Sequence, residues 1–65
     1  MQNAYDVFLW GKEIDTVFYS PCKGGPVPAD EVRRSLINHD GYAGDIVVKR
    51  RAKNGRHVET ADGAK

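Results

Sequence analysis

The amino-acid sequence predicts a small α+β domain of the type ββαβ, with one helix packed on one face of a three-stranded antiparallel sheet. Three observations lead to this prediction. Two runs of aromatic and β-branched residues flank a glycine turn, an amphipathic segment follows a loop rich in Pro and Gly, and a third β-branched run comes after it. We expect residues 1–53 to form this domain, and residues 54–65 to form either a hairpin strand or a flexible tail.

The first hairpin is expected over residues 5–19, around Gly11-Lys12. Gly-X is typical of a two-residue type II′ turn, because glycine accepts a positive φ. This turn would set Leu9 opposite Ile14 and Tyr5 opposite Phe18. Since side chains alternate along a strand, one face should collect the core residues Tyr5, Val7, Leu9, Ile14, Thr16 and Phe18. The other face then mixes three acids with apolar side chains: Asp6, Phe8, Trp10, Glu13, Asp15, Val17 and Tyr19.

A helix is expected after the loop at residues 20–27. Pro28 suits the first helical position, where a missing N–H costs nothing, and Gly41 suits the left-handed residue that ends a helix at His39 or Asp40. Its buried stripe should be Ala29, Val32 and Leu36, with Ile37 at the margin. Its two arginines, Arg33 and Arg34, should point outward, within reach of Asp30 and Glu31.

The third strand is expected over residues 45–51, with Ile46 and Val48 on one face. Asn54-Gly55 follows and is a strong hairpin signal, which would set Arg50 opposite Glu59 and Arg51 opposite Val58. A fourth strand over residues 56–60, giving ββαββ, therefore stays open beside a frayed tail, and residues 61–65 are expected to be disordered. A right-handed crossover through the helix would give the strand order 2-1-3, with no element left to cover the second face of the sheet.

This second face is the first candidate binding surface. Contiguous exposed aromatic and aliphatic side chains usually mark an interaction site. Single-stranded nucleic acid could stack on the rings, a partner protein or a second copy of the chain could bury them, or the face could be partly covered and have no binding role. The carboxylates of Asp6, Glu13 and Asp15 would repel phosphate there, which favours a protein. The expected partner-binding residues are Phe8, Trp10, Val17 and Tyr19.

The charge distribution supplies the second candidate. Residues 1–46 carry four Lys and Arg against seven Asp and Glu, a net charge of −3, whereas residues 47–65 carry six against two, a net charge of +4. Such a basic segment can contact phosphates. It can equally be an edge strand whose charges prevent edge-to-edge pairing. The nucleic-acid-binding residues in the first case would be Lys49, Arg50, Arg51, Lys53 and Arg56.

The sequence contains no motif that predicts catalysis. Cys22 has no general base at a defined spacing, and a set formed with His39 and Asp40 has little support, since His39 near a helix C-terminus suits the helix dipole. The two histidines and the scattered carboxylates match no metal signature. We therefore expect no enzyme activity, no metal, no cofactor and no small-molecule substrate.

The sequence also leads to predictions about the location and the function of the protein. No apolar run approaches membrane-span length, the N-terminal residues lack the regions of a signal peptide, and one cysteine excludes an intramolecular disulfide, so a soluble cytoplasmic protein is expected. In size and style residues 31–42 are similar to small accessory proteins of bacteria, phages or plasmids. The expected function is a non-catalytic interaction module that binds a protein partner or forms a homodimer. The alternative is a nucleic-acid-binding accessory protein.

Overall fold

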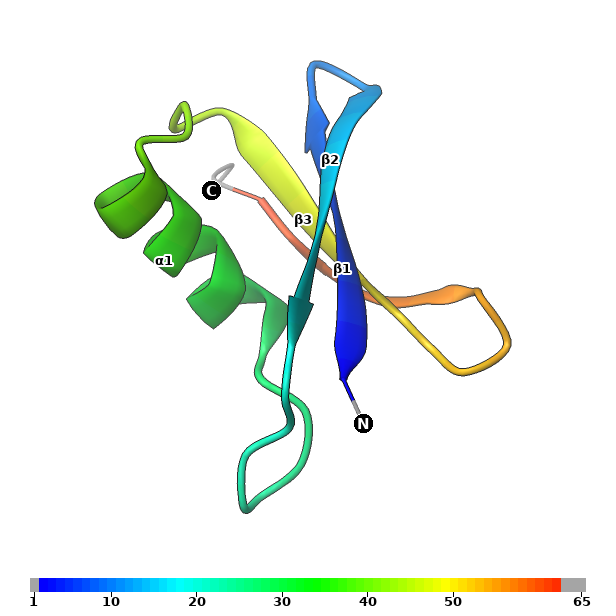
Figure 1. Ribbon diagram of the computed structural model, residues 1–65. Coiled ribbons are helices and arrows are strands. Elements are labelled where there is room, and N and C mark those ends of the chain that lie inside the picture. The colour runs from blue at the N-terminus through cyan, green and yellow to red at the C-terminus, as the bar shows by residue number, and fades with distance from the viewer. Residues whose placement is uncertain (1, 63–65) are drawn as a thin grey trace.

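Two antiparallel hairpins, connected through a helix, form one four-stranded sheet (Figure 1). The computed structural model describes residues 2–62. Its elements are β1 (Asn3–Leu9), β2 (Lys12–Tyr19), α1 (Ala29–Asp40), β3 (Ile46–Arg51) and β4 (His57–Ala61). The strand order is β2-β1-β3-β4. The predicted α+β class and the adjacency of β1 and β3 are confirmed, but the sheet has four strands and not three.

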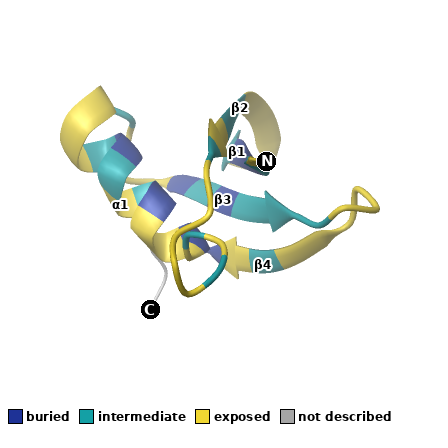
Figure 2. Ribbon diagram, turned by 60° about the horizontal axis from the view of Figure 1, so that its bottom comes forward, coloured by how far each residue is buried: buried dark blue, intermediate teal, exposed yellow. Residues whose placement is uncertain are grey.

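The helix and one face of the sheet enclose the core. α1 packs over β3 and β4, and Figure 2 shows buried residues along the side of the helix and the strands that face each other. The predicted helix stripe of Ala29, Val32 and Leu36 is buried, and Ile37 packs at its margin. The sheet contributes the buried side chains of Tyr5, Val7, Ile46, Val48 and Ala61.

The helix ends differ in how their backbone groups are satisfied. At the C-terminal end Gly41 adopts the expected left-handed conformation, with φ 77°, and its N–H donates to the carbonyl of Leu36. At the N-terminal end Pro28 precedes the first helical residue and offers no side-chain cap. The cap comes instead from β4, because the N–H of Ala29 donates to Glu59 Oε2 over 3.1 Å. Distant residues therefore complete the start of α1.

The first hairpin turns one residue earlier than predicted. The two turn residues are Trp10 and Gly11, with φ 52° and 81°, and Leu9 pairs with Lys12. Two positive φ values are the pattern of a type I′ turn, which matches the twist of the strands. The predicted Gly11-Lys12 turn is therefore wrong, and Trp10 occupies a turn position that usually favours Asn, Asp or Gly.

A β-bulge in β2 then exchanges the faces of its second half. Phe8 pairs with Glu13 but Val7 pairs with Asp15, so Ile14 is an extra residue. A one-residue shift moves every following side chain to the other face. Tyr5 consequently pairs with Val17 and not with Phe18. The predicted core positions of Ile14, Thr16 and Phe18 are wrong, as is the assignment of Val17 and Tyr19 to the uncovered face, because both pack against the core.

The second hairpin exists and includes a bulge of its own. Arg50 pairs with Glu59 as predicted, whereas Arg51 pairs with His57 and not with Val58. Gly55 has a φ of 87°, and its N–H donates to the carbonyl of Ala52 over 3.0 Å, which closes the turn. Ala61 lies in β4 and is buried, so the expected disorder at that residue is wrong; residues 63–65 lie outside the described part of the chain.

No helix among residues 2–62 combines the length and the apolar character that crossing a membrane requires.

Candidate interaction surface

The face of the sheet opposite α1, called the open face below, carries a mixture of aromatic and charged side chains. By strand alternation it receives Asp6 and Phe8 from β1, Thr16 and Phe18 from β2, and Lys49 and Arg51 from β3. Of the four predicted partner-binding residues, only Phe8 lies on this face. Trp10 lies at the hairpin tip, and Val17 and Tyr19 pack on the core side, where the Tyr19 ring meets that of Tyr5 edge to face at 5.7 Å. Phe18, which the sequence pattern assigned to the core, lies on the open face and is 58% exposed.

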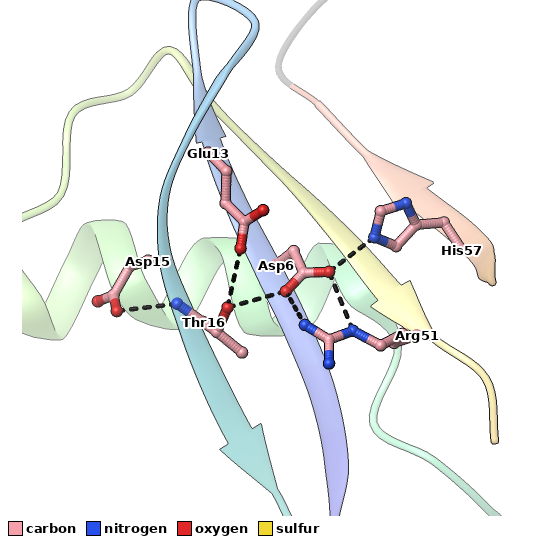
Figure 3. Close-up of polar contacts among 6 residues, drawn as sticks. All are labelled: Asp6, Glu13, Asp15, Thr16, Arg51 and His57. Atoms are coloured by element: carbon pink, nitrogen blue, oxygen red, sulfur yellow. Dashed lines mark hydrogen bonds and ion pairs between the residues drawn. The ribbon is translucent and has the colours of Figure 1, made fainter. Parts of the chain in front are cut away.

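A buried carboxylate organises the centre of the open face. Asp6 is only 3% exposed, although α1, the helix of the described residues, packs on the other face of the sheet. Its Oδ1 accepts hydrogen bonds from Thr16 Oγ1 at 2.8 Å and from Arg51 Nη2 at 2.5 Å, and its Oδ2 lies 3.2 Å from Arg51 Nε and 2.7 Å from His57 Nε2 (Figure 3). These partners come from β2, β3 and β4. The four residues, called the Asp6 cluster below, therefore connect all four strands.

The partners of Asp6 keep it ionised despite its burial. Burial by itself raises the pKa of a carboxyl group. Here the hydrogen bonds from Arg51, His57 and Thr16 outweigh burial, and they lower the pKa of Asp6 from 3.8 to about 2. The carboxylate therefore persists at neutral pH, where the Arg51 guanidinium compensates its charge at close range.

The ring of Phe8 lies beside this cluster and contacts two nitrogen-bearing side chains. Lys49 Nζ is 5.0 Å from the ring centroid, within cation–π distance. The His57 ring meets Phe8 edge to face, with centroids 6.0 Å apart. His57 thus contacts both the Phe8 ring and the Asp6 carboxylate, and Lys49 places a positive charge over the Phe8 ring.

The other two acids of the predicted mixed face have different positions. Glu13 is on the open face, where its Oε2 interacts with Thr16 Oγ1 at 3.1 Å (Figure 3). Asp15 follows the bulge, and its carboxylate accepts a hydrogen bond from the Tyr42 hydroxyl at 2.5 Å. This hydrogen bond lowers the pKa of Asp15 and raises that of Tyr42 to about 12. The prediction that Asp15 shares the open face is therefore wrong, because the bulge moves it.

The basic segment is divided between the two faces. β3 lies between β1 and β4, so the interpretation of this segment as a charged edge strand is wrong. Arg50 points to the helix side, where its Nε binds Glu59 Oε1 at 2.9 Å. Arg51 belongs to the Asp6 cluster. Lys53 and Arg56 lie in the exposed β3–β4 turn.

A groove of about 540 Å³ lies at the end of the sheet where the β3–β4 turn approaches the loop between β2 and α1. Its charged lining residues are Arg51 and Lys53, and none of the lining residues in the described range 2–62 is acidic. The other lining residues are polar or small: Gln2, Asn3, Ala4, Pro21, Pro26, Ala52 and Gly55. Arg51 therefore connects the groove with the Asp6 cluster.

The residues considered for nucleophilic or metal chemistry are not assembled into one site. Cys22 is exposed in the loop that precedes α1. His39 and Asp40 lie at the opposite end of this helix, which is about 18 Å long at 1.5 Å per residue. Among residues 2–62 no group of three or more His, Cys, Asp or Glu side chains is placed to hold a metal ion.

Comparisons of the chain with family models, with curated proteins and with solved structures give no match.

Proposed function

We propose that the chain is a non-catalytic interaction module whose β1–β2 hairpin presents Trp10 to a protein partner. The observation that supports this function is the state of the single tryptophan. Trp10 is 82% exposed at the tip of a two-residue turn, with a φ of 52°. Both its exposure and its backbone conformation are unfavourable for the isolated chain.

The two costs have separate physical origins. A left-handed conformation costs a residue other than glycine about 1–2 kcal/mol, and a bulky residue rarely adopts it. A tryptophan side chain in water also leaves a large apolar surface unburied. Strained residues of this kind concentrate at binding sites, and tryptophan is enriched among the residues that dominate protein interfaces. A partner that buries the indole ring would offset both costs.

The position of Trp10 suits this role. The turn has two residues, and Leu9 pairs with Lys12 directly next to it, so the ring is carried by a short loop anchored to the sheet. Ile14, the extra residue of the bulge, is also exposed and adds apolar surface close to the same tip. These two residues together provide an anchor of the kind that a pocket on another protein can bury.

The first test measures the conformational strain at Trp10 by the substitution Trp10→Asn. Asparagine tolerates the left-handed conformation, and Asn-Gly is a favoured type I′ turn. The variant should therefore unfold at a higher urea concentration, with a gain of about 1 kcal/mol in the free energy of unfolding. A variant that is less stable than the wild type would contradict the strain argument.

The second test identifies what Trp10 touches. A photoreactive phenylalanine analogue placed at position 10 should crosslink a defined protein, or a second copy of the chain, when cells that express it are irradiated. The matched control places the analogue at Asn38, an exposed position of α1. Sedimentation equilibrium of the purified chain and its Trp10→Asn variant decides whether the crosslinked species is a homodimer. Equal crosslinking from positions 10 and 38 would refute the proposal.

A further inference from the structure

A second surface, separate from the Trp10 tip, has the chemistry of a nucleic-acid platform. It consists of Phe8 and Phe18 on the open face and of the cations Lys49, Arg51, Lys53 and Arg56, which run along β3 into the β3–β4 turn. We propose that single-stranded nucleic acid binds along this surface, with bases stacked on the two phenylalanine rings and phosphates contacting the cations down to the groove at the sheet end.

The aromatic part of the surface offers two stacking positions on one face. Phe18 is exposed, and the ammonium group of Lys49 lies over the Phe8 ring, 5.0 Å from its centroid. The Asp6–Thr16 pair lies between them, since Ala4 pairs with Phe18 and Asp6 pairs with Thr16. A base can replace the Lys49 ammonium over Phe8, and the ammonium is then beside the phosphate that follows the base. Aromatic rings on a sheet surface are the usual stacking platform for unpaired bases.

The structure reduces the electrostatic repulsion of phosphate that the sequence predicts for this face. Asp6 is buried beneath its partners and compensated by Arg51, at 2.5 and 3.2 Å. Asp15 is held by Tyr42 after the bulge and lies off the face. Of the three carboxylates expected to repel phosphate, only that of Glu13 stays exposed on the face, at its β1–β2 end. The β3–β4 end carries the cations.

The contacts form a continuous path. Phe8 touches His57, His57 binds Asp6, and Asp6 holds Arg51 through its Nε and one terminal nitrogen. This leaves the second terminal nitrogen of the guanidinium available to a phosphate. Arg51 also lines the groove of about 540 Å³, where Lys53 is the second cation and the part of the chain that the structure describes contributes no acid. If one base of a single strand stacks on Phe8, the phosphates that follow it can contact Arg51 and then Lys53.

The shape of the surface favours single strands over duplexes. Proteins that read a duplex insert an α-helix or a two-stranded β-ribbon into the major groove. The only helix among the described residues packs on the opposite face of the sheet, and its apolar stripe is buried in the core. Stacking on Phe8 and Phe18 also requires bases that are free of pairing partners. The surface therefore fits single-stranded RNA or DNA.

The test measures fluorescence anisotropy of labelled 12-nucleotide single-stranded RNA and DNA, and of the matching duplexes, with the full chain over a range of salt concentrations. Single strands should bind more tightly than duplexes. With Lys49, Lys53 and Arg56 as the uncompensated contacts, affinity should fall with salt with a log–log slope of about −2, and the variant Lys53→Gln should reduce that slope by about 0.7. The control Arg34→Gln removes the same charge from an exposed position of α1 and should leave binding unchanged.

The stacking part is tested by Phe18→Leu, which keeps an apolar side chain at an exposed position and therefore should not affect folding. The loss of one stacked base should weaken binding about fivefold or more. Phe8→Leu should act in the same direction, and its melting temperature shows whether the fold is kept. Inorganic polyphosphate serves as a competitor that carries phosphate without bases, and it should displace the oligonucleotide poorly.

Three results would overturn the proposal. The first is the absence of binding at low salt. The second is an equal loss of affinity in Arg34→Gln and Lys53→Gln, which would indicate attraction by net charge alone. The third is unchanged affinity in Phe18→Leu together with complete displacement by polyphosphate, which would exclude a role for the bases. None of these results bears on Trp10, so the two surfaces are tested separately.

Discussion

The two faces of the sheet bury their central residues in different ways. On the helix side, Val7 and Val48 are buried because α1 covers them, and their partners Val32 and Leu36 are equally apolar. On the open face, Asp6 is almost as inaccessible although residues 2–62 form no second layer over it. Its own hydrogen-bond partners, Arg51, His57 and Thr16, shield it from solvent. One face is thus buried by a layer and the other by a cluster of side chains.

Because the two faces are buried differently, substitutions on them should affect the stability of the fold in different ways. Apolar burial is non-directional and scales with the area removed from water, so the helix side should respond to lost volume. The Asp6 cluster depends on matched charge and on specific oxygen and nitrogen positions, so it should respond to lost charge and to pH. Four sets of substitutions test this contrast, and their effects on stability should decrease in the order Leu36, Asp6, Val17 with Phe18, and Glu59.

The substitution Leu36→Ala should have the largest effect. Leu36 is fully buried between α1 and the sheet, and its truncation leaves a cavity. Loss of the transferred apolar surface and the cavity together should lower the free energy of unfolding by about 2–5 kcal/mol, as measured by urea denaturation. The neighbouring Ser35→Ala serves as a control on the same helix. A loss below 1 kcal/mol would mean that the helix contributes little to the core.

Asp6→Asn should have the next largest effect, and it should depend on pH. A pKa of about 2 in the folded chain, against an ordinary value of 3.8, contributes about 2 kcal/mol of stability above pH 4. Because the folded pKa is the lower one, this stability is lost as pH falls from about 4 towards 2. Asp6→Asn should therefore be less stable than the wild type at pH 7, and the difference should shrink below pH 3.

The check is a series of urea denaturation curves between pH 7 and pH 2, with Asp45→Asn as the matched control at an exposed position. If wild type and Asp6→Asn lose stability in parallel over this range, the Asp6 cluster does not stabilise the fold through its charge.

The neighbouring substitutions Val17→Ala and Phe18→Ala test the bulge itself. Val17 packs against the core, whereas Phe18 is exposed. Val17→Ala should cost about 1–2 kcal/mol, and Phe18→Ala should stay within about 0.5 kcal/mol of the wild type. A continuous hairpin without the bulge at Ile14 predicts the reverse order. The melting temperatures of the two variants, measured side by side, therefore decide which face of β2 is buried.

Glu59→Ala should have the smallest effect of the four. Its carboxylate binds Arg50 and caps the N–H of Ala29, and the Arg50 hydrogen bond lowers the pKa of Glu59. Loss of the cap should cost about 1 kcal/mol and should speed amide hydrogen exchange in the first turn of α1. Glu59→Gln retains an oxygen that can accept the Ala29 hydrogen bond, so it should cost less. Equal exchange rates in the two variants would contradict the capping role.

Local sequence patterns predicted most of the elements but not their faces. The helix, its stripe and its end at Gly41 follow from apolar spacing and from the left-handed preference of glycine, which act within a few residues. The bulge at Ile14 has no comparable signal. It moves Thr16 to a position where its hydroxyl meets Asp6, and it moves Val17 and Tyr19 into the core. That gain depends on contacts between residues far apart in the chain.

The candidate surfaces could be predicted only in part, because they too depend on contacts between residues far apart in the chain. Phe8 and the basic segment were evident as residue types, but the division of Arg50 and Arg51 between opposite faces required the sheet order. Arg33 is a further example. It was expected to point outward on α1, yet its guanidinium donates to the backbone carbonyls of Gly44 and Ile46 at the start of β3. The exposed aromatic residue that was missed, Phe18, depends on the bulge.

Sequence patterns were sufficient for the first β-hairpin, the amphipathic helix, the third strand and the glycines where the chain turns with positive φ, whereas they left the second hairpin open beside a flexible tail. These features follow from propensities and periodicities that each segment carries alone. The turn at Trp10, the orientation of the side chains of β2 and the burial of Asp6 depend on tertiary contacts. A charged side chain is buried only where distant donors converge on it, and the strand registers that bring Thr16, Arg51 and His57 to Asp6 are set by the packing of the whole sheet.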